Sequence, residues 1–176
     1  MHVLHSIKVN KDRPFRIFLS GCAGVGKSTV IRALFQMVTH YYDNISGPQN
    51  NSIRVLLCAF SGKAAYLING MTLHSAFQLP VQQNHKPMAE LSHDVANTIR
   101  EKLINLKLLI IDEISMVGSM LLKRVDIRLR QIMGENEDFG GIDVITVGDL
   151  KQLPPVFDSP VFKVPPLMIL QQSLIL

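Results

Sequence analysis

Cysteine is scarce in this chain, with only Cys22 and Cys58 among its 176 residues. Two isolated cysteines give neither the ligand spacing of a zinc site nor a disulfide framework, which favours a reducing compartment over secretion. Long apolar runs are also lacking, because none reaches the roughly 18 residues of a membrane-spanning helix. The N-terminal stretch MHVLHSIKVNKDRPF has no unbroken apolar core of the kind found in signal peptides. We therefore expect an intracellular protein that does not associate with a membrane.

Charged residues are few, at 18% of the chain against a usual share of about one quarter. Apolar residues make up 47%, which is enough for one domain with a substantial core. This balance is typical of an α/β domain whose central strands are buried on both faces. The net charge of +4 permits a nucleic-acid partner, but an ordinary basic surface explains it equally well.

Short apolar segments alternate with helical ones along the chain. Residues 15–21, 53–59, 107–113 and 142–149 read as strands, and 27–42, 62–68 and 96–106 as helices. A further helix is expected up to about residue 133, with Ser115 or Ser119 as its cap. Residues 43–52 and 79–93 read as loops. The alternation predicts an α/β fold with a parallel sheet, helices on both faces, and ligands at the carboxyl ends of the strands.

The segment GCAGVGKST follows the first predicted strand and opens the first predicted helix. It matches the phosphate-loop pattern at Gly21, Gly26, Lys27 and Ser28. The glycines allow a tight turn whose N–H groups face phosphate oxygens, and the helix adds the positive end of its dipole. Lys27 is expected to reach the β- and γ-phosphates, and the Ser28 hydroxyl to coordinate Mg²⁺.

Two acids end the strand in LLIIDE. Asp112 is suited to hold Mg²⁺ through its water shell, and Glu113 to act as the general base that polarises an attacking water. Either acid alone is equally consistent with a helix cap. Combined with the phosphate loop, the pair predicts Mg-nucleotide binding and favours hydrolysis over phosphoryl transfer to a small molecule.

The stretch VGDLKQLPPV follows the last predicted strand, which we expect to lie beside the strand ending at Asp112. The amide of Gln152 is able to donate to a γ-phosphate oxygen and to accept from the attacking water. Pro154 and Pro155 fix their own φ angles and bias the residues before them toward extended conformations. A loop so restricted is suited to relay a change at the phosphate.

Four segments, GCAGVGKS, CAFSGKAAYLINGMTLHSAF, LLIIDEISMV and VGDLKQLPPV, occur in the order found in Pif-one-like DNA helicases. The chain resembles this 5′-to-3′ branch of superfamily one, related to RecD-type helicases, over about residues 15–156. The resemblance implies a RecA-like P-loop fold, ATP and Mg²⁺ as cofactors, and single-stranded DNA and a DNA duplex or fork as partners. In a eukaryote it implies the nucleus or the mitochondrion.

The resemblance also implies a role for individual residues. The catalytic set comprises Lys27, Asp112, Glu113 and Gln152, with Gln152 as the γ-phosphate sensor, and the metal ligands are Ser28 and Asp112. The nucleotide-binding residues are Gly21, Cys22, Ala23, Gly24, Val25, Gly26, Lys27, Ser28 and Thr29. The DNA-contacting residues are Phe60, Ser61, Gly62, Lys63, Thr72, His74 and Ser75.

The DNA-contacting region departs slightly from the family, with Ser61 where Thr is usual and Phe60 where Pro or Ser is common. Lysine charge, hydroxyl groups and aromatic faces suit a nucleic acid there. However, His74 is equally consistent with a hydrogen-bonded structural histidine, and Phe77 fits the core better than a base-stacking platform.

The larger departures lie at the two ends. Residues 1–15 lack the glutamine of the family's adenine-recognition motif, and the chain stops at Leu176 without the second RecA-like domain and its arginine. We therefore expect an extension over 1–14, a RecA-like domain over 15–160, and a tail over 161–176 that leads to the missing domain. Such a chain should bind Mg-ATP weakly and hydrolyse it slowly.

The alternative function is a nucleotide-binding regulatory or DNA-binding module without motor activity. A small-molecule kinase is disfavoured because no Arg-rich lid is visible.

Overall fold

The computed structural model describes residues 14–46, 53–80, 88 and 90–162. One parallel sheet of five strands lies at the centre of this part of the chain, in the order β1-β5-β4-β2-β3. The strands are β1 (Arg16–Ser20), β2 (Val55–Ala59), β3 (Met71–Thr72), β4 (Leu108–Asp112) and β5 (Asp143–Gly148). The predicted α/β fold with a parallel sheet is confirmed.

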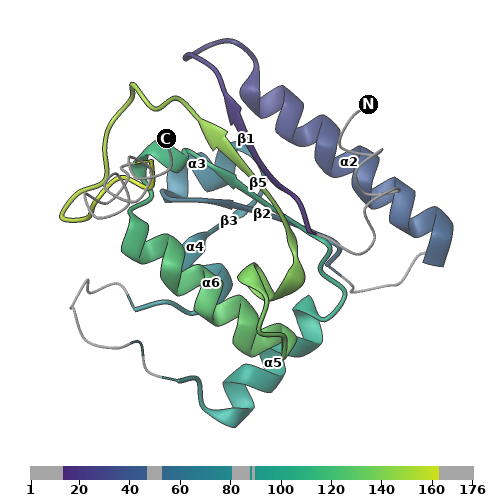
Figure 1. The fold of residues 1–176 in the computed structure, drawn as a ribbon. Coiled ribbons are helices and arrows are strands. Elements are labelled where there is room, and N and C mark those ends of the chain that lie inside the picture. Colours follow the sequence, from purple (N-terminus) through teal and green to yellow (C-terminus); the bar gives the residue numbers. More distant parts are fainter. Residues whose placement is uncertain (1–13, 47–52, 81–87, 89, 163–176) are drawn as a thin grey trace, which may run out of the picture.

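Helices cover both faces of the sheet (Figure 1). The α-helices are α2 (Lys27–Ser46), α3 (Gly62–Leu67), α4 (Leu73–Phe77), α5 (His93–Leu103) and α6 (Ser119–Met133), and the 3-10 helices are η1 (Ile114–Met116) and η2 (Asp138–Gly141). Figure 1 shows α2 on one side of the sheet and α5 and α6 on the other. Among the described helices, none is both long and apolar enough to cross a membrane.

Alternate residues of β2 and β4 serve two separate cores, which is why both strands are apolar without interruption. One core joins Leu57, Ile110 and other strand residues to α2 and α3, and the second joins Cys58, Ile111 and their neighbours to α4, α5 and α6. Burial raises the pKa of the Cys58 thiol to about 12, which agrees with a purely structural role.

Several predicted element boundaries differ from the structure. The helix expected over 27–42 continues to Ser46, so the first part of the expected loop over 43–52 is helical, and α5 begins at His93. β3 and α4 were not predicted, because two and five residues are too few to display a period. The predicted cap at Ser115 or Ser119 is wrong: Gly118 is the N-cap residue of α6 and Ser119 is its first helical residue. Of the predicted end segments, residues 1–13 and 163–176 lie outside the described part of the chain, as do 47–52.

Candidate functional site

Three neighbouring strands bring the predicted catalytic segments to one edge of the sheet. β5 lies between β1 and β4, with Ser20 opposite Gly148 and Ile111 opposite Thr146. The phosphate loop after β1, the acids at the end of β4 and the loop after β5 therefore leave the sheet side by side. A hydrogen bond of 3.2 Å from Gly21 N to Gly148 O joins the first and last of these segments.

The phosphate loop forms an open cradle. Residues 22–26 are exposed, and Gly24 and Gly26 adopt φ angles of 78° and 89°, which a residue with a Cβ rarely adopts. The backbone N–H groups of residues 22–28 donate to no atom in the described part of the chain. Unpaired donors at the start of the 20-residue helix α2 fit a phosphate group.

Lys27 closes the cradle from within. Its Nζ donates to Gly21 O and Cys22 O, both at 2.7 Å. These two carbonyl oxygens are hydrogen-bond acceptors for the ammonium group. A bound phosphate would replace them as the acceptor. The structure thus places the Lys27 ammonium group against the backbone at the start of the phosphate loop.

Asp112 is 7% exposed and lies at the buried end of β4. Burial raises the pKa of its carboxyl group, while the Glu113 N–H bond of 2.9 Å and the charge of Lys27 act in the opposite direction. The charge of Lys27 favours the ionised form of Asp112, so the phosphate loop and the acid at the end of β4 are coupled electrostatically. Among the described residues, no group of three or more His, Cys, Asp or Glu forms a metal cluster. Oxygen ligands from Ser28 and Asp112 fit Mg²⁺, which needs only one or two protein ligands beside substrate phosphates.

Glu113 adopts a left-handed backbone conformation, with φ 54° and ψ 44°. Such a conformation costs a residue with a Cβ about 1–3 kcal/mol and tends to occur at functional sites. The Glu113 carboxylate accepts a hydrogen bond of 3.2 Å from Ser61 Oγ. Sequence reasoning missed this contact, because 52 positions separate the two residues and no local pattern connects them.

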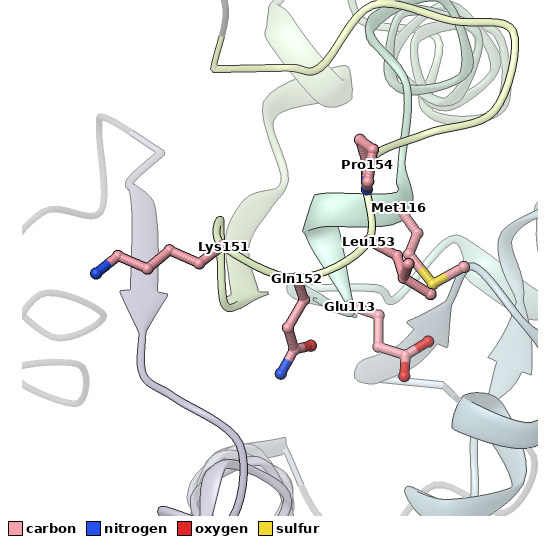
Figure 2. Close-up of a pocket in the computed structure, with 6 residues that line it drawn as sticks. All are labelled: Glu113, Met116, Lys151, Gln152, Leu153 and Pro154. Carbon is pink, nitrogen blue, oxygen red and sulfur yellow. The ribbon is translucent and has the colours of Figure 1, made fainter.

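Gln152 lies in a short turn at the end of β5. Its N–H donates to Asp149 O at 3.0 Å, and Lys151 N donates to Asp149 Oδ1 at the same distance. Figure 2 shows the Gln152 and Glu113 side chains extending from adjacent loops to the same side, with Lys151 pointing away. They border an open pocket of about 550 Å³, completed by Met116, Lys151, Leu153 and Pro154.

The predicted DNA-contacting residues form a second group, at the far end of the same edge. β2 and β3 are paired, with Ala59 opposite Thr72, so residues 60–63 and 72–75 both begin where these strands end. Gly62, Lys63 and Ser75 are exposed. The structure therefore brings this set together, separated from the phosphate loop by β4 and β5.

Several members of this second group also have structural roles. Ser61 Oγ accepts from Ala64 N at 3.2 Å as the cap of α3, and Thr72 Oγ1 accepts from Ser75 N as the cap of α4. Phe60 packs against the core, and Phe77 is fully buried. The expectation that Phe77 belongs to the core is confirmed.

His74 is half-buried, and its pKa is lowered by burial and by the positive charge of Arg124. Between about pH 7.5 and 5 the unfolded chain gains this proton before the folded chain does, so the wild-type protein should lose stability as the pH falls. We expect His74→Asn to lose less stability over that range. Urea unfolding at several pH values measures the difference, and parallel pH curves for the two proteins would contradict this account.

Comparisons with known proteins agree with this geometry. The family model for PIF1-like helicase matches residues 1–173. The chain is 32% identical over 154 residues to the ATP-dependent DNA helicase PIF1 of Emericella nidulans, covering 86% of this chain and 20% of that protein. It is 33% identical over 141 residues to the human ATP-dependent DNA helicase PIF1, covering 80% of this chain and 20% of that protein.

A solved structure supports the same relationship. Pif1 helicase from Bacteroides, in complex with ADP-AlF3 and single-stranded DNA, superimposes with a TM-score of 0.64 and 31% identity over 98% of this chain and 35% of that chain. The present chain thus spans about a fifth of the length of these curated relatives and about a third of that solved chain. By its family match, its sequence identity and its sheet, this chain belongs to the PIF1-like helicase family.

Proposed function

We propose that this chain is the first RecA-like motor domain of an ATP-dependent 5′-to-3′ DNA helicase. The observation that carries the proposal is the meeting of Lys27, Asp112–Glu113 and Gln152 at the carboxyl ends of three adjacent strands. Residues 15–160 would form this domain, and the catalytic arginine would come from a second RecA-like domain. Such an arginine is worth factors of about 10³ to 10⁵ in related NTPases.

The proposed reaction is hydrolysis of Mg-ATP. The unpaired N–H groups of residues 22–28 and the Lys27 ammonium would bind the β- and γ-phosphates. Ser28 and Asp112 would hold Mg²⁺, which neutralises phosphate charge when bound. Glu113 would take a proton from the attacking water, whose oxygen would bond to the γ-phosphorus. The bond from the γ-phosphorus to the β–γ bridging oxygen would break, giving ADP and phosphate. Gln152 would sense the γ-phosphate from the neighbouring loop.

Single-stranded DNA is the proposed partner of residues 60–63 and 72–75, together with a duplex or fork ahead of it. The exposed Lys63 supplies charge, and the exposed Ser75 supplies a hydroxyl for phosphate contacts. The hydrogen bond between Ser61 and Glu113 would connect this DNA segment to the general base. In this proposal the same edge of the sheet would bind nucleotide at the ends of β1, β5 and β4 and DNA at the ends of β2 and β3.

ATP turnover with and without single-stranded DNA tests the proposal, for this chain and for a chain extended at both ends. We expect slow turnover by the 176-residue chain and DNA-stimulated turnover by the extended one. Lys27→Ala should abolish turnover in both, which controls for a contaminating ATPase. An extended chain that binds nucleotide but shows no stimulation would instead favour a module without motor activity.

A further inference from the structure

The loop that carries Gln152 ends in a polar contact that the proposed function leaves unused. Asp158 lies against the N-terminus of α6, and its carboxylate accepts from Met120 N at 3.1 Å, Leu121 N at 3.3 Å and Ser119 Oγ at 3.3 Å. The first N–H groups of a helix have no partner within the helix, and an anion at that end is favoured by the helix dipole. Asp158 therefore caps α6 from a distant part of the chain.

The N-terminus of α6 is shaped to receive this carboxylate. Its N-cap residue is Gly118, which has no side chain with which to cap the helix. A Cβ at Gly118 would overlap the carboxyl group of Asp158, although its φ of −80° suits any residue. Ser119 N also donates to Ser159 O at 2.8 Å, and Gly118 pairs with Pro160 in a β-bridge. We call the Asp158 carboxylate and the N-terminal groups of α6 that it contacts the α6 clamp.

The α6 clamp is the next anchor of the chain after Gln152. Residues 153–157 form no hydrogen bond with any other described residue. The side chains of Leu153, Val156 and Phe157 are 69%, 60% and 98% exposed. Pro154 and Pro155 limit the conformations of this five-residue span. Gln152 is thus fixed on one side by the turn at Asp149, and on the other through a stiff span whose first contact with α6 is Asp158, followed by Ser159 and Pro160.

The α6 clamp also fixes the Gln152 loop relative to the general base. η1 and Gly118 join Glu113 to the start of α6, and Met116 of η1 borders the same pocket as Gln152 and Leu153. In Figure 2, Met116 and Leu153 lie next to each other between the two loops. A loop released from α6 would be free to move away from η1, and the Gln152 amide would move with it.

We infer that Asp158 is a positioning residue that holds Gln152 in the place where it senses the γ-phosphate. The inference rests on the sensor role of Gln152 in the proposed function. The Asp158 carboxylate contacts α6 and none of the residues proposed to bind nucleotide. Its loss should therefore reduce the discrimination between nucleotides with and without a γ-phosphate. Binding of ADP should persist, because Lys27 and the phosphate loop belong to β1 and α2, outside the α6 clamp.

The first measurement uses a tryptophan in the loop. The chain contains no Trp, so Phe157→Trp, at an exposed position beside Asp158, gives a single fluorescent reporter. In this background, Asp158→Ala and Gly118→Ala should both lower the fluorescence anisotropy, since each breaks the α6 clamp from one side. Asp158→Asn retains an acceptor oxygen and should give an intermediate value. Unchanged anisotropy in both alanine variants would overturn the inference.

The second measurement compares affinities for ATPγS and ADP in the presence of Mg²⁺, from the amide resonances of the phosphate loop, which report even weak binding. Asp158→Ala should reduce the preference for ATPγS by about 2- to 10-fold, the value of one ordinary hydrogen bond. Gln152→Ala should reduce it by a similar factor. The control is Asp126→Ala, which removes a carboxylate of α6 itself that accepts the backbone N–H of Phe139 and pairs with Arg130, without contacting Asp158.

The outcomes distinguish the sensor role of Gln152 from the positioning role of Asp158. If Gln152→Ala leaves the preference unchanged, the sensor role of Gln152 in the proposed function is wrong, and the positioning role of Asp158 fails with it. If Gln152→Ala lowers the preference and Asp158→Ala does not, the sensor role stands and the positioning role of Asp158 is wrong. A fall in Asp126→Ala equal to that in Asp158→Ala would also overturn the inference, because general destabilisation would then explain both.

Discussion

Replacing Glu113 with glutamine is expected to slow ATP turnover by about 10²- to 10⁴-fold, the usual contribution of a general acid or base. The amide has nearly the same shape as the carboxylate and can still accept the hydrogen bond from Ser61 Oγ. A glutamine amide is unable to take a proton from water, so only the rate of the chemical step should fall. Nucleotide binding should persist, because the phosphate loop follows β1 whereas Glu113 follows β4.

Single-turnover hydrolysis by the chain extended at both ends, with single-stranded DNA present, measures this effect. Glu135→Gln is a matched control, since Glu135 is exposed and lies just beyond α6, away from the phosphate loop. Equal rates for wild type and Glu113→Gln would mean that another group activates the water. A parallel loss of nucleotide binding would mean that Glu113 acts through structure instead.

Replacing Phe77 with alanine is expected to lower the free energy of unfolding by about 3–5 kcal/mol, because the substitution removes a large buried ring and leaves a cavity. Phe77 is fully buried at the end of α4, in the core shared with α5 and α6. A loss of this size is a large part of the stability of an ordinary domain. Urea unfolding followed by circular dichroism measures it.

Tyr66→Ala is the matched control, since this aromatic side chain on α3 is 81% exposed and should change stability by no more than about 0.5 kcal/mol. A small loss for Phe77→Ala would mean that the ring is not part of a tightly packed core. That result would return Phe77 to the candidates for base stacking.

The buried strands and the phosphate loop were predictable from sequence because their signals are local. The strand expected over 107–113 appears as β4 (Leu108–Asp112), and the one over 142–149 as β5 (Asp143–Gly148). Their predicted adjacency is confirmed by the pairing of β4 with β5. An unbroken apolar run, a glycine-rich turn and a helical period each need only a few neighbouring residues to be recognised.

The contacts that the sequence does not reveal join residues far apart in the chain. The helix cap expected at Ser115 or Ser119 comes instead from Asp158, 39 positions beyond Ser119, and local capping rules do not reach so far. The hydrogen bond from Ser61 to Glu113 spans 52 positions. Only the strand order of the sheet brings such residues together, and this order follows from the whole chain.

The place of β1 at the edge of the sheet has a consequence for folding during synthesis. β1 pairs with β5, and the hydrogen bond from Phe15 N to Asp143 Oδ1 spans 128 positions. A ribosome therefore produces β1 before β2 and β4, and completes its partner strand β5 only near residue 148. Contacts of such long separation form slowly, and an unpaired apolar strand invites aggregation. The phosphate loop, although it is synthesised before β2, β4 and β5, is among the last parts of the domain able to reach its final geometry.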